Sequence, residues 1–178
     1  MREVEIKAWV DDFEAVKSYF DEHASQGRPV YKEDCYFKRP GEKKQALRLR
    51  NNGGILEFTT KRNNKNEKGE ENNYEYEFTS SIDQLDKAKE FFTVLGYEHH
   101  FIKRKKGFDW DYRKVHVELL EVEGVGVFLE MEALIDFDAN EEEVQRNIDL
   151  LYSILDEVNI PHDKVERRSY RAMILKEE

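Results

Sequence analysis

The sequence predicts one α+β domain over residues 1–178, built on a curved antiparallel sheet or a barrel. Two observations favour this class: short segments with alternating apolar and charged residues recur along the chain, and a few segments have a helical period. A length of 178 residues fits a single domain, and 12 % aromatic residues are too many for a disordered acidic chain. The sequence contains neither an internal repeat nor a proline-rich linker.

The first half of the chain alternates strands with two helices. Asp11 or Asp12 can cap a helix over about residues 12–24, and a second helix is expected over 82–95. Residues 62–73 carry no apolar side chain, which predicts a mobile loop. The strands expected in this half cover residues 2–9, 30–38, 46–50, 55–61 and 74–79.

The second half is richer in strands and contains the longest helix. Asn140 can cap a helix over 141–158, whose first turn holds three glutamates that suit the positive end of the helix dipole. Residues 164–175 predict a short helix or strand. The strands expected in this half cover residues 98–105, 108–112, 115–122 and 127–134.

Charge and cysteine content limit the partners that we expect. A net charge of −10 repels a nucleic-acid backbone unless the basic residues are gathered in one place. No apolar run approaches the roughly 18 residues of a membrane helix, and residues 1–5 lack the apolar stretch of a secretory signal. The single cysteine, Cys35, agrees with a reducing compartment. We therefore expect a cytoplasmic protein that binds neither nucleic acid nor a membrane.

Charged residues of one sign recur two apart on strand after strand, so each pair projects from one sheet face. Such a face is most often solvated. If the strands close into a barrel, these faces line its interior, where like charges are costly unless ions neutralise them. Carboxylates suit Mg²⁺ or Mn²⁺, whereas Arg and Lys suit phosphate oxygens, so the pattern predicts a metal-dependent polyphosphate site. The acidic pairs are Glu3/Glu5, Glu75/Glu77 and Glu130/Glu132, and the basic residues are Lys7, Arg48/Arg50, Lys61 and two of Lys103, Arg104 and Lys105.

Six segments resemble, in order along nearly the whole chain, the motifs of one known family. They are Glu3-Val4-Glu5-Ile6-Lys7, Leu47-Arg48-Leu49-Arg50, Phe58-Thr59-Thr60-Lys61, Glu75-Tyr76-Glu77, the segment 124–132 and Ser169-Tyr170. They resemble the ExExK, RxR, TxK, ExE, GxGxFxExE and Ser-Tyr motifs of the CYTH superfamily, the triphosphate tunnel metalloenzymes. That family includes class IV adenylyl cyclases, thiamine triphosphatases and inorganic triphosphatases.

The resemblance implies an eight-stranded antiparallel β-barrel (tunnel) flanked by helices, with Mg²⁺ or Mn²⁺ as cofactor and a small-molecule triphosphate as substrate. A homodimer is one option. The resemblance assigns metal ligands to Glu3, Glu5, Glu75, Glu77, Glu130 and Glu132. It assigns phosphate contacts to Lys7, Arg48, Arg50, Lys61, Lys103 and Lys105.

The sequence departs from the family pattern at three places. Lys103-Arg104-Lys105 stands where the family has a KxR strand, and Leu120 stands where an acidic residue often precedes the GxG segment. The His-Phe that precedes ExExK in class IV cyclases has no counterpart before Glu3. This last departure favours a triphosphatase over a cyclase.

The preferred reaction is hydrolysis of a terminal phosphoanhydride, in which Lys or Arg neutralises the charge that builds on the phosphate oxygens. The catalytic residues expected are Lys7, Glu77 and Tyr36: Glu77 or Glu132 orients the water, and Tyr36 pairs with Lys7. Two alternatives stay open. One is a class IV adenylyl cyclase that converts ATP to cyclic AMP and pyrophosphate, and the other is a non-catalytic module that binds polyphosphate or nucleotides.

Overall fold

The computed structural model describes residues 2–42, 47–65, 71–136 and 138–177, without the side chains of residues 2, 61–65 and 71–75. The chain divides into two compact units, which we call unit 1 (Met1–Val30 and Lys105–Glu178) and unit 2 (Tyr31–Arg104). A single domain over the whole chain stays a prediction.

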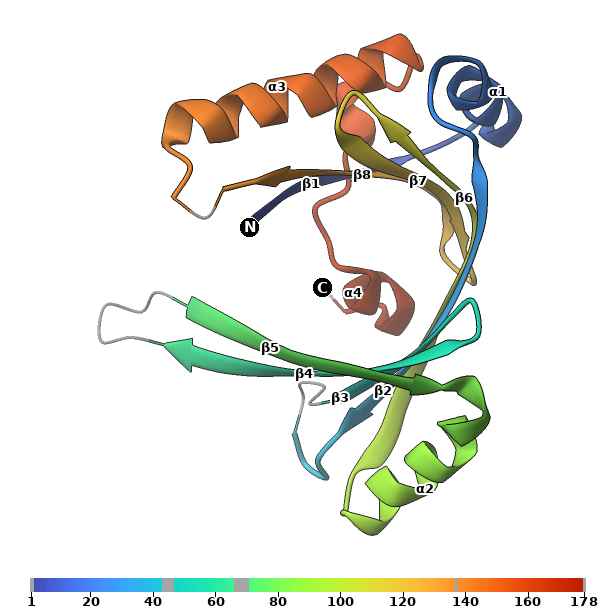
Figure 1. Cartoon of the computed structure of the whole chain (residues 1–178), viewed down its shortest axis with the longest axis vertical. Coiled ribbons are helices and arrows are strands. Elements are labelled where there is room, and N and C mark those ends of the chain that lie inside the picture. The colour runs from blue at the N-terminus through green and yellow to red at the C-terminus, as the bar shows by residue number, and fades with distance from the viewer. Residues whose placement is uncertain (1, 43–46, 66–70, 137, 178) are drawn as a thin grey trace. The chain divides into compact units, whose positions relative to one another are not determined.

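Eight strands form one sheet (Figure 1). The strands are β1 (Arg2–Trp9), β2 (Arg28–Lys38), β3 (Leu47–Asn52), β4 (Ile55–Lys65), β5 (Glu71–Ser81), β6 (Glu98–Tyr112), β7 (Val115–Val122) and β8 (Gly126–Ile135). Neighbours hydrogen-bond in the order β1-β8-β7-β6-β2-β3-β4-β5, which confirms the eight-stranded antiparallel architecture. Because β1 and β5 end this order, hydrogen bonds among the described strands do not close the sheet.

Two helices begin directly after Asp12 and Asn140, the residues that the sequence marks as caps. The side chain of Asp12 accepts from the backbone N–H of Ala15, and that of Asn140 accepts from the N–H of Glu143. The helices are α1 (Phe13–His23), α2 (Leu85–Val94), α3 (Glu141–Glu157) and α4 (Tyr170–Leu175), with short 3₁₀ turns η1 (Ile82–Gln84) and η2 (His162–Lys164). The segment 164–175 therefore holds the end of η2 and the helix α4.

Unit 1 buries one face of its strands beneath α1 and α3 and places α4 against the opposite face (Figure 1). The alternation along β1 and β8 sends Val4 and Met131 into the core beneath α3, where Leu151 and Ile154 are fully buried. Each large apolar side chain buried in this way contributes about 1.5–3 kcal/mol. The opposite face of the same strands is left with the charged residues.

Unit 2 has its own smaller core, in which Cys35, Leu49 and Leu56 pack with Phe92 of α2. Cys35 is 1 % exposed and Leu49 is fully buried, so the residues next to them in sequence point to the other face of the sheet. This alternation places Asp34 of β2 and Arg48 and Arg50 of β3 on the face away from α2.

The prediction of a loop over residues 62–73 is wrong. Residues 62–65 belong to β4 and 71–73 to β5, and Asn63 pairs with Asn73 across the hairpin. Backbone hydrogen bonds hold an antiparallel ladder whatever the polarity of its side chains, so a polar run does not exclude a strand. The tip, residues 66–70, lies outside the described residues.

The two strands predicted over 98–105 and 108–112 are one continuous strand, β6. Gly107, which lies between the two predicted strands, sits in the middle of β6. A Cβ at this position would lie 1.9 Å from the backbone oxygen of Leu119, so the glycine permits the close approach of β7 rather than ending the strand.

Candidate functional site

Acidic residues of unit 1 face one another across β1, β8 and β7. Glu5 lies directly opposite Glu132, and Glu132 lies directly opposite His116. Directly opposite residues share a sheet face, and two like charges there repel each other. The family resemblance assigns Glu5 and Glu132 as metal ligands, and the strand register places the two residues side by side. Glu3 is exposed, lies opposite Leu134, and is two residues before Glu5 on β1, so its side chain is on the same face of the sheet.

A second row runs across the same three strands. Lys7 lies opposite Glu130, and Glu130 lies opposite Glu118, which is 7 % exposed. The ammonium of Lys105 donates to both carboxylate oxygens of Glu130, at 2.6 and 2.9 Å, and Tyr170 of α4 donates to the same carboxylate. Glu130 is therefore the acid on which the basic and hydroxyl groups of this face converge.

The electrostatics of these rows favour a cation. Glu5 keeps contact with solvent, yet removal of water from its carboxylate, followed by the charge of Glu130, raises its pKa. The ammonium groups of Lys105 and Lys7 oppose this shift and do not cancel it. A divalent cation would lower the pKa of Glu5 and remove the repulsion between carboxylates.

The space between the rows suits an ion. A cavity of about 20 Å³ is lined by Glu5, His116, Glu118, Glu130, Met131 and Glu132. Beside it, one possible ligand atom each from Asp109, His116 and Glu118 lies within 4.8 Å of the others. The Glu118 carboxylate, 3.8 Å from Nε2 of His116, raises the pKa of that imidazole. These oxygen-rich donors fit Mg²⁺ or Mn²⁺.

The segment before α4 contacts the same face. Lys7 donates to the backbone oxygen of Arg168 at 2.6 Å, and its ammonium lies 4.2 Å from the centre of the Tyr170 ring. The ammonium of Lys105 lies 4.4 Å from the same ring. Burial, then the charge of Glu130, raises the pKa of the Tyr170 hydroxyl, so Tyr170 stays neutral and acts as a donor. Desolvation lowers the pKa of Lys7.

Glu166 anchors the residues that border this face. Its carboxylate accepts from Nε1 of Trp9 at 3.1 Å and from Nη2 of Arg168 at 2.6 Å, and its side chain is 9 % exposed. The hydrogen bonds from Arg168 lower the pKa of Glu166 from 4.5 to about 2. The carboxylate therefore fixes an indole and a guanidinium next to each other.

A Glu166→Gln variant is expected to lose about 1–3 kcal/mol of unfolding free energy at neutral pH, since charged hydrogen bonds are lost. Because the pKa of Glu166 is depressed in the folded state, its contribution is complete above pH 4.5 and disappears as the pH falls toward 2. Denaturant unfolding at several pH values in this window tests the prediction. The two proteins should converge as the solution is acidified, and a constant difference would contradict the prediction.

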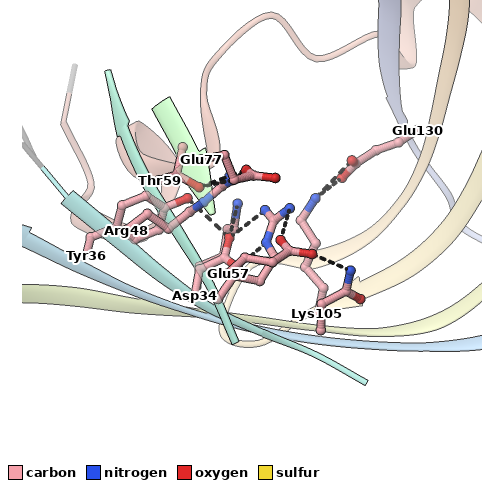
Figure 2. Close-up of polar contacts among 11 residues, drawn as sticks. Asp34, Tyr36, Arg48, Glu57, Thr59, Glu77, Lys105 and Glu130 are labelled. Atoms are coloured by element: carbon pink, nitrogen blue, oxygen red, sulfur yellow. Dashed lines mark hydrogen bonds and ion pairs between the residues drawn. The ribbon is translucent and has the colours of Figure 1, made fainter. Parts of the chain in front are cut away.

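In unit 2 a buried carboxylate binds the predicted phosphate contacts (Figure 2). Asp34 is fully buried and accepts from Nε and Nη2 of Arg50, at 2.6 and 3.0 Å. The ammonium of Lys103 lies 2.9 Å from Asp34, and the hydroxyl of Tyr36 donates to it at 3.2 Å. Burial alone would raise the pKa of Asp34, but the hydrogen bonds from Arg50 and the charge of Lys103 hold it well below its usual range.

Tyr36 has a partner other than the one predicted from the sequence. Its hydroxyl donates to Asp34, its ring stacks on Phe101 at 4.4 Å, and burial, then the charge of Asp34, raises its pKa to about 12. A pair with Lys7 stays a prediction. The high pKa makes Tyr36 a hydrogen-bond donor at neutral pH.

A second group in unit 2 joins Arg48, Thr59 and Glu77 (Figure 2). Arg48 donates to the Thr59 hydroxyl at 2.9 Å, the hydroxyl donates to Glu77 at 3.0 Å, and Arg48 and Glu77 lie 3.5 Å apart. The Nε of Arg48 is buried and has no hydrogen-bond partner among the described residues. An anion could satisfy this donor.

The structure resolves the register that the sequence left open on β6. Lys103 pairs with Asp34 and Lys105 with Glu130, whereas Arg104 pairs with Glu33 at 2.6 Å. Lys103 and Lys105 are 8 % and 6 % exposed. The backbones of Lys61 and Glu75 pair across β4 and β5, but their side chains, both assigned from the sequence, lie outside the described residues.

Sequence reasoning missed Asp34, Glu118 and His116 as members of these groups. Asp34 and Tyr36 are two apart on β2, but the sequence was searched only for pairs of charged residues of the same sign. A pair made of an acid and a tyrosine does not meet that criterion. Glu118 and His116 likewise alternate on β7 and face Glu130 and Glu132. A search for any polar residues two apart would have found both pairs.

Comparisons with known proteins show which family the chain resembles. The family model of the CYTH domain matches residues 1–170. A Methanocaldococcus jannaschii protein, named as a candidate adenylate cyclase, is 30% identical over 175 residues, which cover 96% of this chain and 97% of that protein. Among the described residues, no helix is both long and apolar enough to span a membrane.

Solved structures with the same fold cover nearly the whole chain. A conserved hypothetical protein from Pyrococcus furiosus has 29% identity and a TM-score of 0.67, with 97% of this chain and 99% of that chain covered. A Hippeastrum protein, described as a candidate adenylyl cyclase with a dominant triphosphatase activity, has 15% identity, a TM-score of 0.67 and coverage of 98% and 94%. The tunnel fold expected from the sequence is consistent with these neighbours.

Proposed function

Because the chain belongs to the CYTH family, whose members act on triphosphates, we propose that it is a metal-dependent hydrolase of triphosphate-containing substrates. The substrate would be inorganic triphosphate or the triphosphate of thiamine or a nucleoside. The observation that carries the proposal is the convergence of carboxylates and ammonium groups in unit 1: Glu5, Glu130 and Glu132 lie in adjacent rows with Lys7 and Lys105. Such a surface is complementary to a divalent cation together with a phosphate chain.

We propose that Glu5, Glu130 and Glu132 hold Mg²⁺ or Mn²⁺, with Glu3, Glu75 and Glu77 as the further acids. When bound, the cation would neutralise the negative charge on the phosphate oxygens of the substrate. Lys7 and Lys105 already lie beside Glu130 and bind phosphate oxygens from the same face. Arg48, Arg50, Lys61 and Lys103 are the proposed phosphate contacts of unit 2.

Within unit 2, Glu77 is the proposed residue that orients the attacking water. Its carboxylate is held by the Thr59 hydroxyl at 3.0 Å and lies 3.5 Å from Arg48, so it keeps its charge and its direction. Tyr36 is the proposed donor to a phosphate oxygen, since it is neutral at physiological pH.

Product analysis tests the proposal. Purified protein is incubated with tripolyphosphate, thiamine triphosphate or ATP, each with Mg²⁺, Mn²⁺ or EDTA. We expect orthophosphate release that requires a metal and stops in EDTA. Absence of metal-dependent release from all three substrates would overturn the proposed hydrolase.

A second reaction is favoured by the name of the M. jannaschii relative, which is 30% identical to this chain. A class IV adenylyl cyclase would convert ATP to cyclic AMP and pyrophosphate on the same metal and phosphate contacts. Cyclic AMP with equimolar pyrophosphate in the ATP reaction would identify the cyclase and replace the hydrolase proposal.

A further inference from the structure

A cavity of about 400 Å³ lies in unit 1 beside the charged face, between the end of β1, the turn between β7 and β8, and α4. This volume is in the range of small-molecule sites. Its lining residues are Trp9, Gly124, Val125, Arg168, Ala172, Met173, Lys176 and Glu177. Neither the metal rows nor the proposed phosphate contacts use any of them.

The wall formed by Trp9 is held in a fixed orientation. Its indole lies 4.2 Å from the ring of Phe128 and donates to Glu166. A Cβ on Gly126 would lie 2.7 Å from the indole, so the glycine leaves room for the ring to lie over the start of β8. A rigid aromatic surface of this kind binds a planar ring at little entropic cost.

The other walls supply groups that favour aromatic rings. The guanidinium of Arg168 is fixed by Glu166, and the Met173 thioether is a soft, polarisable contact. Guanidinium planes and thioethers both pack well on aromatic faces. Arg168 and Lys176 are cations and Glu177 is an acid, so the walls offer both hydrogen-bond donors and an acceptor to the polar edge of a ring.

The cavity adjoins the proposed phosphate site through two links. Trp9 follows Lys7 by two residues on β1, so both side chains share one face. Lys7 also donates to the backbone oxygen of Arg168, a lining residue, at 2.6 Å. A ligand whose phosphates contact Lys7 therefore has its remaining part next to Trp9.

We propose that this cavity binds the heteroaromatic base of a nucleoside triphosphate, and that the preferred substrate of the protein is accordingly a nucleotide rather than inorganic triphosphate. The proposal rests on the proposed function, because it uses the same phosphate contacts. The base stacks between Trp9 and the side chains of α4, while the phosphates extend toward Lys7.

Tryptophan fluorescence provides a test that does not depend on turnover. The chain has two tryptophans, of which Trp110 is fully buried in the core. Titration with the imido analogue of ATP and Mg²⁺ should quench Trp9, whereas tripolyphosphate should not. Trp9→Phe should abolish the quench and retain the Trp110 emission of a folded core. Equal responses to both ligands would overturn the proposal.

A cavity-filling variant gives the second test. Ala172→Phe should raise the dissociation constant of the ATP analogue at least about tenfold and leave the KM for tripolyphosphate unchanged. Ala15→Phe, which places the same ring on an exposed site of α1, should alter neither. Equal effects on both ligands, or tighter binding of thiamine triphosphate than of ATP, would overturn the assignment.

The two proposals fail in different ways. Quenching by the nucleotide without release of phosphate from any substrate would support the proposed base-binding cavity and overturn the proposed hydrolase activity. Metal-dependent hydrolysis of tripolyphosphate, with no quenching of Trp9 fluorescence and no preference for ATP, would support the proposed hydrolase activity and overturn the proposed base-binding cavity.

Discussion

A Glu132→Gln variant should have a metal-dependent turnover more than about 100-fold lower than that of the wild type. Loss of a residue that hydrogen-bonds a metal ligand typically costs about 10–100-fold in activity, and loss of a ligand itself should cost more. Glu132 lies opposite Glu5 and beside the cavity between the acidic rows. Its charge is among the groups that raise the pKa of Glu5. The amide keeps the shape of the side chain and removes the attraction for a cation.

Titration of Mg²⁺ or Mn²⁺ against the rate measures this effect, and added metal should restore part of the lost activity. The melting temperature should not fall, because removing one of two facing carboxylates relieves repulsion. Glu121→Gln is the matched control, since Glu121 is an exposed residue of β7 that pairs with Lys106 at 2.9 Å. Unchanged metal dependence in Glu132→Gln would show that Glu132 is not a ligand.

Replacing Asp34 by alanine is expected to lower the free energy of unfolding by about 3–5 kcal/mol, which is the cost of removing one partner of a buried ion pair. Asp34 is fully buried, and the side chains of Arg50 and Lys103 that it binds are 18% and 10% exposed. Removing the carboxylate leaves these two cations close together without their counter-ion. Chemical denaturation at neutral pH measures the loss.

Glu142→Ala serves as the control, because it breaks an exposed pair with Arg146 on α3 and should cost less than about 0.5 kcal/mol. The pKa of Asp34 is held low in the folded state, so its contribution should persist at all pH values above about 3.8 and decline below that. Added tripolyphosphate should stabilise Asp34→Ala more than the wild type, because it can replace the missing charge. A loss no larger than that of the control would contradict the prediction.

The sequence was sufficient to predict most elements, because the signals for them are local. Alternation identified β1, and Asp12 and Asn140 marked the starts of α1 and α3. The polar end of the β4–β5 hairpin could not be predicted in this way. Its ladder depends on backbone hydrogen bonds to a partner strand, which side-chain polarity does not report.

The candidate site was predictable only in part. Motif resemblance selected Glu5 and Glu132, but their direct opposition depends on the pairing of β1 with β8, residues more than a hundred positions apart. The burial of Asp34 beneath Arg50 depends on the packing of β2 against β3. Pairing between distant strands is not encoded in any local pattern, so these contacts required the structure.

The outer edge of β1 is bonded to the far end of the chain: Ala8 forms a bridge with Val165, and the backbone N–H of Glu166 donates to the backbone oxygen of Lys7 at 2.7 Å. During synthesis β1 emerges first, yet it has neither neighbour until residues beyond 125 have been made. The strand hairpins of unit 2 can form as soon as Arg104 is in place. The order in which the ribosome releases the chain therefore delays formation of the acidic rows of unit 1 until unit 2 has had time to fold.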